Sequence, residues 1–450
     1  MFYFSNSLRR RCAAVPAFAS FFLALPPSAA AQTPKTPLTP SSQSLNASAA
    51  QAPISLRAAL DAAWALHPSS KSSGHRRAEL DARARATQSF ISGPLSVGLA
   101  HRTDALSGDA GLREVEVEIA LPLWSPAVRR ATQGQVSADG AALAWQQRTE
   151  QLKLAGEVRE AAAQVALARA ERDGAARKHL EATQLAQDVE RRVQAGDSPR
   201  VDALQARASA QQAQGALAAS DAVLQRAQGQ WRALTGQTQA ASLDEPLTPA
   251  AHKLAASVDT GPGVQTAPTL RVAPIDHPAL QAAQAQVHSA RARLALTEAD
   301  RRDPMELGLG VTRERAAAGA NLETSLRFAL RIPLGRDSRN APKLAVARAE
   351  LDAVQALADA VARQTEADVA AAHADLDAAH SQEALATQRA TLLTQMQALV
   401  AKSHRLGESD LPTRMRADNE KLDADLSLVR ARIALQRAIS QLNQSLGTLP

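Results

Sequence analysis

The sequence is poor in the residues that build most globular cores and disulfide scaffolds. Only 7 Phe, 4 Trp and 1 Tyr occur among its 450 residues, together with a single cysteine. Because aromatic side chains supply much of the buried area of ordinary cores, and a disulfide framework needs several cysteines, the composition excludes an aromatic-rich β-sandwich and a disulfide-stapled domain. Much of the 45% hydrophobic share is alanine, the best helix former. The composition therefore favours long helices that pack closely on one another.

Long hydrophobic runs are also missing. No stretch approaches the length of a membrane-spanning helix, so we expect none. Residues 1–31 have the pattern of a secretory signal peptide, with Arg9 to Arg11 as the basic region, Ala13 to Leu25 as the apolar region and Ala29 to Ala31 as the cleavage site. Cys12 would be removed with this peptide, which leaves a mature chain without thiol chemistry. These features predict a secreted, periplasmic or outer-membrane protein.

Landmarks of the sequence recur at a nearly constant spacing, which indicates two tandem repeats. At a shift of 211 residues, Leu121-Pro122-Leu123 falls on Ile332-Pro333-Leu334, and Gly196 and Gly236 fall on Gly407 and Gly447. The His-Pro pair at 67–68 recurs at 277–278. We expect an extended N-terminal arm over 32–54, the first repeat over 55–241, a Pro/Thr/Gly-rich linker over 242–274 and the second repeat over 275–450.

Each repeat contains two segments in which apolar and polar residues alternate, as is typical of strands. The predicted strands cover about 94–101, 114–121, 305–313 and 322–332. Each has one apolar and one polar face and is long enough to cross a bilayer as a tilted strand. A soluble four-stranded sheet with one face on a core is the alternative. Since four strands cannot enclose a lumen, a membrane barrel would require several chains.

Two very long helices are predicted after the strand pairs, over about 127–195 and 345–406. Helices of that length span on the order of 90–100 Å, which no single globular core buries. Leu385, Leu392, Leu399 and Leu406 recur every seven residues, a coiled-coil spacing. Narrow alanine-padded seams beside polar faces fit a hollow ring of helices better than a solid bundle.

The doubled order of helix, strand pair, long helix and second helix resembles the TolC-type outer-membrane efflux proteins. The resemblance covers nearly the whole mature chain and includes the helix that opens after Ser55, the His67-Pro68 pair, the Leu-Pro-Leu segment and the glycine-containing turns. Within the family, residues 331–335 and 405–411 are most similar to components paired with heavy-metal cation exporters.

The resemblance implies a mainly α protein with a small β part. A homotrimer would share a twelve-stranded β-barrel in outer-membrane lipid, continued by an α-helical barrel in the periplasm. It would be a passive exit duct without enzyme activity or cofactor, joined through a periplasmic adaptor protein to a proton-driven inner-membrane pump. Two features depart from the family. Only Trp124 and Phe328 lie where aromatic girdles are expected, and Thr413, Arg414 and Arg416 stand where the second tip helix often has Asp.

The candidate functional residues fall into two groups. The turns that end the long helices would contact the adaptor, and acidic or basic residues beside the lumen would act on passing ions. The tip candidates are Gly196, Asp197, Gly407, Glu408 and Asp410, and the lumen or gate candidates are Asp202, Arg416, Glu114, Glu116 and Glu118. Simpler interpretations remain: Asp197 with Ser198, and Asp410, could be helix N-caps, the glycines C-caps, and the glutamates a solvated sheet face.

Other chemistries find little support in the sequence. His373, Asp377 and His380 share a helix face, but the two histidines are two turns apart, so we interpret them as a polar stripe and predict no metal site. Lys and Arg are interspersed with Asp and Glu, and aromatics for stacking are scarce, so we expect no nucleic-acid partner. Two rival functions remain: export of drugs or other organic compounds by the same channel, and a periplasmic coiled-coil adaptor or scaffold.

Overall fold

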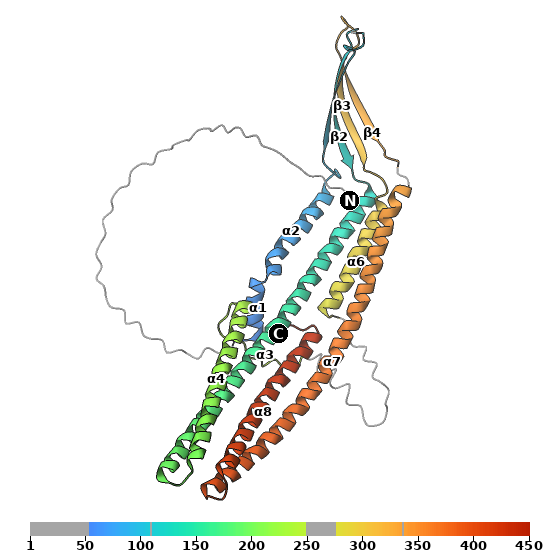
Figure 1. Ribbon diagram of the computed structural model, residues 1–450. Helices are drawn as coiled ribbons and strands as arrows, with labels where there is room; N and C mark the ends of the chain where they lie inside the picture. The colour runs from blue at the N-terminus through green and yellow to red at the C-terminus, as the bar shows by residue number, and fades with distance from the viewer. Residues whose placement is uncertain (1–53, 109, 249–275, 335–336) are drawn as a thin grey trace, which may run out of the picture. The chain divides into compact units, whose positions relative to one another are not determined.

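The computed structural model describes residues 54–108, 110–248, 276–334 and 337–450 (Figure 1). The predicted signal peptide, nearly all of the predicted arm and most of the predicted linker lie outside these residues. The elements run in the order α1 (Leu56–Leu66), α2 (Pro68–Gln88), β1 (Ser96–Thr103), β2 (Arg113–Leu123), α3 (Pro126–Ala195), α4 (Arg200–Thr235), α6 (Pro278–Ala299), β3 (Met305–Arg315), β4 (Glu323–Arg331), α7 (Asp337–Arg405) and α8 (Leu411–Ser445). The predicted class, mainly α with a small β part, is confirmed.

The strands form one antiparallel sheet in the order β1-β2-β3-β4. The register puts Leu99 opposite Val117, Val117 opposite Val311, and Val311 opposite Leu326, so the apolar residues of all four strands share one face. Leu99 and Leu326 are 76% and 73% exposed. The described residues therefore do not bury this face on a core, as the soluble-sheet alternative would require.

The long helices lead away from the sheet. The 70-residue helix α3 begins three residues after β2 and spans about 105 Å, so the sheet and the turn at Gly196 lie at opposite ends of it. Helix α4 packs along α3, and α8 packs along α7 (Figure 1). Helix α7 begins at Asp337 rather than near 345, because the helix continues through Pro342 instead of starting after it.

A hydrophobic core forms where α1 packs against α3 and α4. The buried face of α1 repeats at the helical spacing: Leu56, Ala59, Leu60 and Ala63. Ser55 caps this helix by accepting a hydrogen bond from the backbone N–H of Ala58. In the same core Trp231 of α4 is 1% exposed, and its indole N–H donates to the carbonyl of Gln239 at 3.0 Å. The chain has few aromatic residues, and the buried Trp231 thus lies where helices of the first repeat meet.

A buried ion pair joins the two halves of the chain. Arg159 of α3 and Glu245, in the segment after α4, are 4% and 8% exposed, and the guanidinium donates to both carboxylate oxygens of Glu245. Ser440 donates to the same carboxylate at 2.9 Å, and Arg159 also donates to the carbonyl of Thr448 at 3.1 Å. Gln444 accepts a further bond from Arg159. The pair therefore ties α3, the start of the linker and the end of α8 to one another.

The recurring His-Pro pair starts a helix in each half. The Nδ1 atoms of His67 and His277 accept hydrogen bonds from the backbone N–H groups of Ser69 and Ala279, at 3.3 and 3.1 Å. Each histidine is an N-cap, and the proline that follows occupies the first helical position, where its missing N–H costs nothing. Burial lowers the pKa of His277, with the charge of Asp368 acting in the opposite direction.

Removing one partner of the buried ion pair tests its role. We expect Glu245→Ala to lower the free energy of unfolding by about 3–5 kcal/mol, because Arg159 would be left buried without a counter-charge. Denaturant unfolding followed by circular dichroism measures the change. Glu79→Ala is the matched control, since the Glu79–Arg83 pair is more than half exposed and should contribute about 0–1 kcal/mol. Equal losses in the two variants would contradict the role of the buried pair.

The cap at His277 predicts a pH dependence of stability. Because the pKa of His277 is lowered on folding, the unfolded chain binds more protons than the folded chain below pH about 6.5. Stability contributed by neutral His277 is therefore present above that pH and lost as the pH falls toward the lowered folded pKa. His277→Asn keeps an N-cap acceptor without a titrating group. Its stability should fall less between neutral and mildly acidic pH, and an unchanged slope would show that His277 is not responsible.

Candidate functional site

The turns that end the two long helices have the same geometry. Gly196 and Gly407 adopt left-handed conformations with φ of 84° and 78°. The N–H groups of Asp197 and Glu408, which follow them, donate to the carbonyl five residues earlier at 2.8 and 3.0 Å. This is the Schellman motif, in which glycine avoids the strain that a Cβ would cause. Asp197 and Glu408 are exposed beyond each turn, as a contact surface for a partner requires.

The helices that follow the two turns, α4 and α8, begin differently. Asp410 is the N-cap of α8, and its carboxylate accepts a hydrogen bond from the N–H of Thr413 at 3.1 Å, as predicted. Hydrogen bonds from the hydroxyl and the backbone N–H of Thr413, together with the charge of Arg416, hold the pKa of Asp410 below its usual value. The predicted cap by Asp197 and Ser198 is wrong, because Pro199 is the N-cap of α4 and no side chain caps it. Pro199 lies 211 residues before Asp410, so the cap position of the first half holds a residue without an acceptor.

The predicted gate residues lie on different hairpins. Asp202 lies in the first turn of α4, half-buried, where a carboxylate is favoured by the helix dipole. Arg416 is exposed on α8. On α7, burial and the charges of Arg414 and Arg192 lower the pKa of His404. The tips of one chain therefore carry charges of both signs.

The three predicted glutamates of β2 share the polar face of the sheet. Glu114 lies 3.8 Å from Arg102 of β1, and Glu116 pairs with Arg327 of β4. The carboxylate of Glu118 lies over the backbone of Gly308, where an added Cβ would come within 2.6 Å of its oxygen. The glycine of β3 thus makes room for a glutamate of β2. The structure brings these glutamates together on the sheet, at the opposite end of α3 from the tips.

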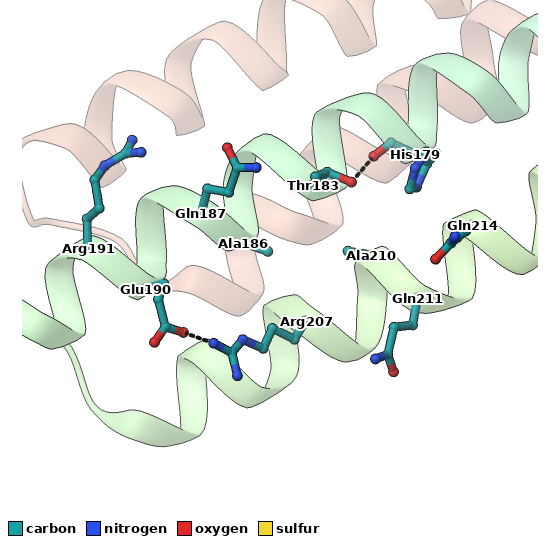
Figure 2. Close-up of a pocket in the computed structure, with 10 residues that line it drawn as sticks. All are labelled: His179, Thr183, Ala186, Gln187, Glu190, Arg191, Arg207, Ala210, Gln211 and Gln214. Carbon is teal, nitrogen blue, oxygen red and sulfur yellow. Dashed lines mark hydrogen bonds and ion pairs between the residues drawn. The ribbon is translucent and has the colours of Figure 1, made fainter.

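A groove on the α3–α4 hairpin was not predicted from the sequence (Figure 2). Its volume is about 550 Å³, and Glu190 of α3 forms an ion pair with Arg207 of α4 across it at 3.0 Å. The lining residues are His179, Thr183, Ala186, Gln187, Glu190, Arg191, Arg207, Ala210, Gln211 and Gln214. The residues on α3 recur at a helical spacing, but which of them face α4 could not be read from the sequence.

The predicted polar stripe of α7 does not gather into a metal centre. The Nδ1 atom of His373 lies 4.0 Å from the carboxylate of Asp377. Within the described ranges, no group of three or more His, Cys, Asp or Glu side chains could hold a metal ion. Among the described helices, none combines the length and apolar character that crossing a membrane requires.

Solved structures with the same arrangement are outer-membrane channels. Neither a protein-family model nor a curated protein matches the sequence. The outer membrane protein VceC from Vibrio cholerae superimposes with a TM-score of 0.65 at 16% identity, covering 87% of this chain and 96% of that one. CusC gives 0.68 at 15% identity, covering 88% and 93%. The open state of the MtrE outer membrane channel of Neisseria gonorrhoeae gives 0.63 at 14%, covering 87% and 89%.

The chain has the TolC-type channel fold. At these identities the likeness establishes the fold, and the predicted resemblance is confirmed at that level. In this TolC-type fold the candidate residues form two separate groups. Gly196, Asp197 and Asp202 lie with their second-half counterparts at the ends of the hairpins, whereas the glutamates of β2 lie on the sheet.

The two unequal caps give a matched test at the tips. Asp410→Ala should measurably lower the free energy of unfolding, because α8 loses its N-cap bond. Asp197→Ala, at an exposed position without a cap bond, should change it by much less. Denaturant unfolding of the two variants measures both changes. A loss at Asp197 as large as that at Asp410 would mean that the first turn depends on a contact other than a cap.

Proposed function

We propose that the protein is the outer-membrane exit duct of a tripartite efflux system, which conducts its substrates passively from the periplasm to the exterior. The observation that carries this proposal is the apolar face of the four-stranded sheet. Its side chains on the edge strands β1 and β4 are more than 70% exposed at Leu99, Leu326 and Phe328. A face of this kind is stable in lipid and costly in water.

Closure of the sheet requires further copies of the chain. β1 and β4 are the edges of the sheet, and unpaired strand edges do not occur in hydrocarbon. Three copies, each giving four strands, would close a twelve-stranded barrel in which β4 of one copy pairs with β1 of the next. The long helices of the three copies would continue this barrel as a helical tunnel in the periplasm. The fold shared with outer-membrane channels supports this homotrimer.

The tips and the α3–α4 groove are the proposed contact surface for a periplasmic adaptor protein. Asp197 and Glu408 are exposed just beyond the rigid glycine turns. The groove offers uncharged amides and the Glu190–Arg207 pair to a partner helix. Through the adaptor, the duct would be joined to a proton-driven pump in the inner membrane, which supplies the energy. The chain itself would have no enzymatic activity.

Heavy-metal cations are the proposed substrates. Residues 331–335 and 405–411 resemble the components that serve metal exporters, and glutamates outnumber arginines on the polar face of the sheet, which would line the lumen. Deleting the gene should raise sensitivity to metal cations and leave drug sensitivity unchanged, and re-expression should restore the tolerance. Raised drug sensitivity with normal metal tolerance would instead favour export of organic compounds.

Two adjacent substitutions on β4 test the membrane barrel. Leu326 and Ser325 are both exposed but lie on opposite faces of the sheet. An arginine on the lipid face of a barrel costs about 2–4 kcal/mol near the midplane, whereas a lumen position tolerates it. We therefore expect Leu326→Arg, but not Ser325→Arg, to abolish a heat-sensitive trimer in the outer-membrane fraction, measured by fractionation and electrophoresis. Recovery of the unaltered chain as a soluble monomer, as an adaptor or scaffold would behave, would refute the proposal.

A further inference from the structure

Three arginines gather on the apolar face of the sheet at its hairpin end, which is the end remote from α3 and α7. The register sets Arg113 of β2 directly opposite Arg315 of β3, and Arg313 lies two residues before Arg315 on the same strand. Alternation along the strands puts all three on the face that carries Val117 and Val311. We call Arg113, Arg313 and Arg315 the arginine cluster. Directly opposed like charges destabilise a sheet, so a negatively charged group beside the cluster would stabilise it.

No carboxylate of the described residues pairs with the arginine cluster. Every ion pair that the described residues form across the sheet lies on the polar face. Glu114 and Glu314, which adjoin the cluster along the strands, point to that face as well. Two members of the cluster are exposed, and the third, Arg315, is half-buried, with its Nε–H donating to the carbonyl of Gly111 at 3.4 Å. The cluster therefore presents its guanidinium groups without a counter-charge from the described part of the chain.

The arginine cluster lies where the hydrocarbon of a membrane would end. The 11 residues of β2 extend from Leu123 beside α3 to Arg113 at the hairpin end. At about 3.3 Å per residue and a tilt of about 40°, this strand would cover about 25 Å across a membrane. The apolar band of an outer-membrane barrel is also about 25 Å tall. With Leu123 at one edge of the band, the cluster reaches the headgroups at the other edge, where an arginine on the lipid side is tolerated.

We infer that the arginine cluster binds the phosphate groups of lipid headgroups in the outer leaflet of the membrane. The inference rests on the proposed duct, in which the apolar face meets lipid and the hairpin end points outward. A guanidinium donates two parallel N–H groups to phosphate oxygens, so one phosphate can bridge two arginines that otherwise repel each other. In the trimer, three copies of the cluster gather phosphorylated lipids around the outer rim of the barrel. This is a contact of the chain with its membrane, separate from the path of the exported substrate.

Lipid binding to the full-length trimer in detergent tests the inference. The probe is lipid A, a glycolipid that carries two phosphates, and native mass spectrometry measures the bound fraction as its concentration is varied. Replacing Arg113, Arg313 and Arg315 together by Gln removes the charges and should weaken binding about tenfold or more, because charge-assisted hydrogen bonds to phosphate are lost. Lipid A stripped of both phosphates should bind the unaltered trimer as weakly as intact lipid A binds this triple variant.

A single substitution on each face of the sheet supplies the matched comparison. Arg313→Gln should weaken the binding of lipid A about threefold. Arg102→Gln removes the same charge at the same end of the sheet, but Arg102 lies opposite Glu114 on the polar face, so the affinity should stay unchanged. An equal loss in the two variants would mean that lipid A responds to net charge alone, which overturns the inference.

The remaining outcomes separate the lipid site from the duct. Unaltered chain that forms no trimer refutes the proposed function and the inference with it. A trimer that binds lipid A equally well in the triple variant overturns the inference and leaves the duct standing, and so does one whose lipid A is displaced by an equal concentration of inorganic phosphate. Where the triple variant fails to assemble, Arg313→Gln replaces it, because this side chain is exposed. An unchanged affinity in that variant overturns the inference as well.

Discussion

The buried pair of Arg159 and Glu245 sets the level at which the helices of the two halves meet, in addition to the β2–β3 pairing of the sheet. Alanine-rich helices bury little area per turn, so their packing alone specifies register weakly. A bidentate pair with further bonds to Ser440 and the carbonyl of Thr448 accepts one geometry only. It holds α3, the start of the linker and the end of the chain at the same height along the helix axes. The sheet and the tips at either end of α3 are placed relative to this level.

Exposed ion pairs between α3 and α8 extend the contact that begins at the Arg159–Glu245 pair. Arg437 and Arg430 of α8 pair with glutamates of α3 at 2.8 Å each, and Asp423 lies 3.6 Å from Lys178. The three α8 residues are seven apart and so follow one face of the helix. Each pair contributes about 0–1 kcal/mol, so these ion pairs align the hairpins without holding them rigidly. In the proposed duct, a polar contact surface between α3 and α8 would let the hairpins adjust where a row of leucines would resist.

Features set by local sequence could be predicted, and features set by distant pairing could not. Alternation placed all four strands within two residues of their bounds, and Gly196 and Gly407 marked the turns. The cap predicted at Asp197 failed because Pro199 occupies the cap position. Nothing local links Arg159 to Glu245, which lies 86 residues away. The side chains that line the α3–α4 groove are set by the register of two packed helices, which periodicity alone does not determine.

The scarcity of aromatics has a structural consequence at the sheet. The apolar face consists mainly of Val, Leu and Ile and gives way to His101, Arg113, Arg313 and Arg315 at its hairpin end. Phe328 is its one Phe, Tyr or Trp in the described strands, so it offers apolar area without the rings that anchor a barrel at the membrane interfaces. Trp124, between β2 and α3, has a buried indole N–H without a hydrogen-bond partner among the described residues. At the junction of sheet and helices, three such indoles in a trimer would lie at one interface. The depth of the proposed barrel would then be set from the periplasmic side.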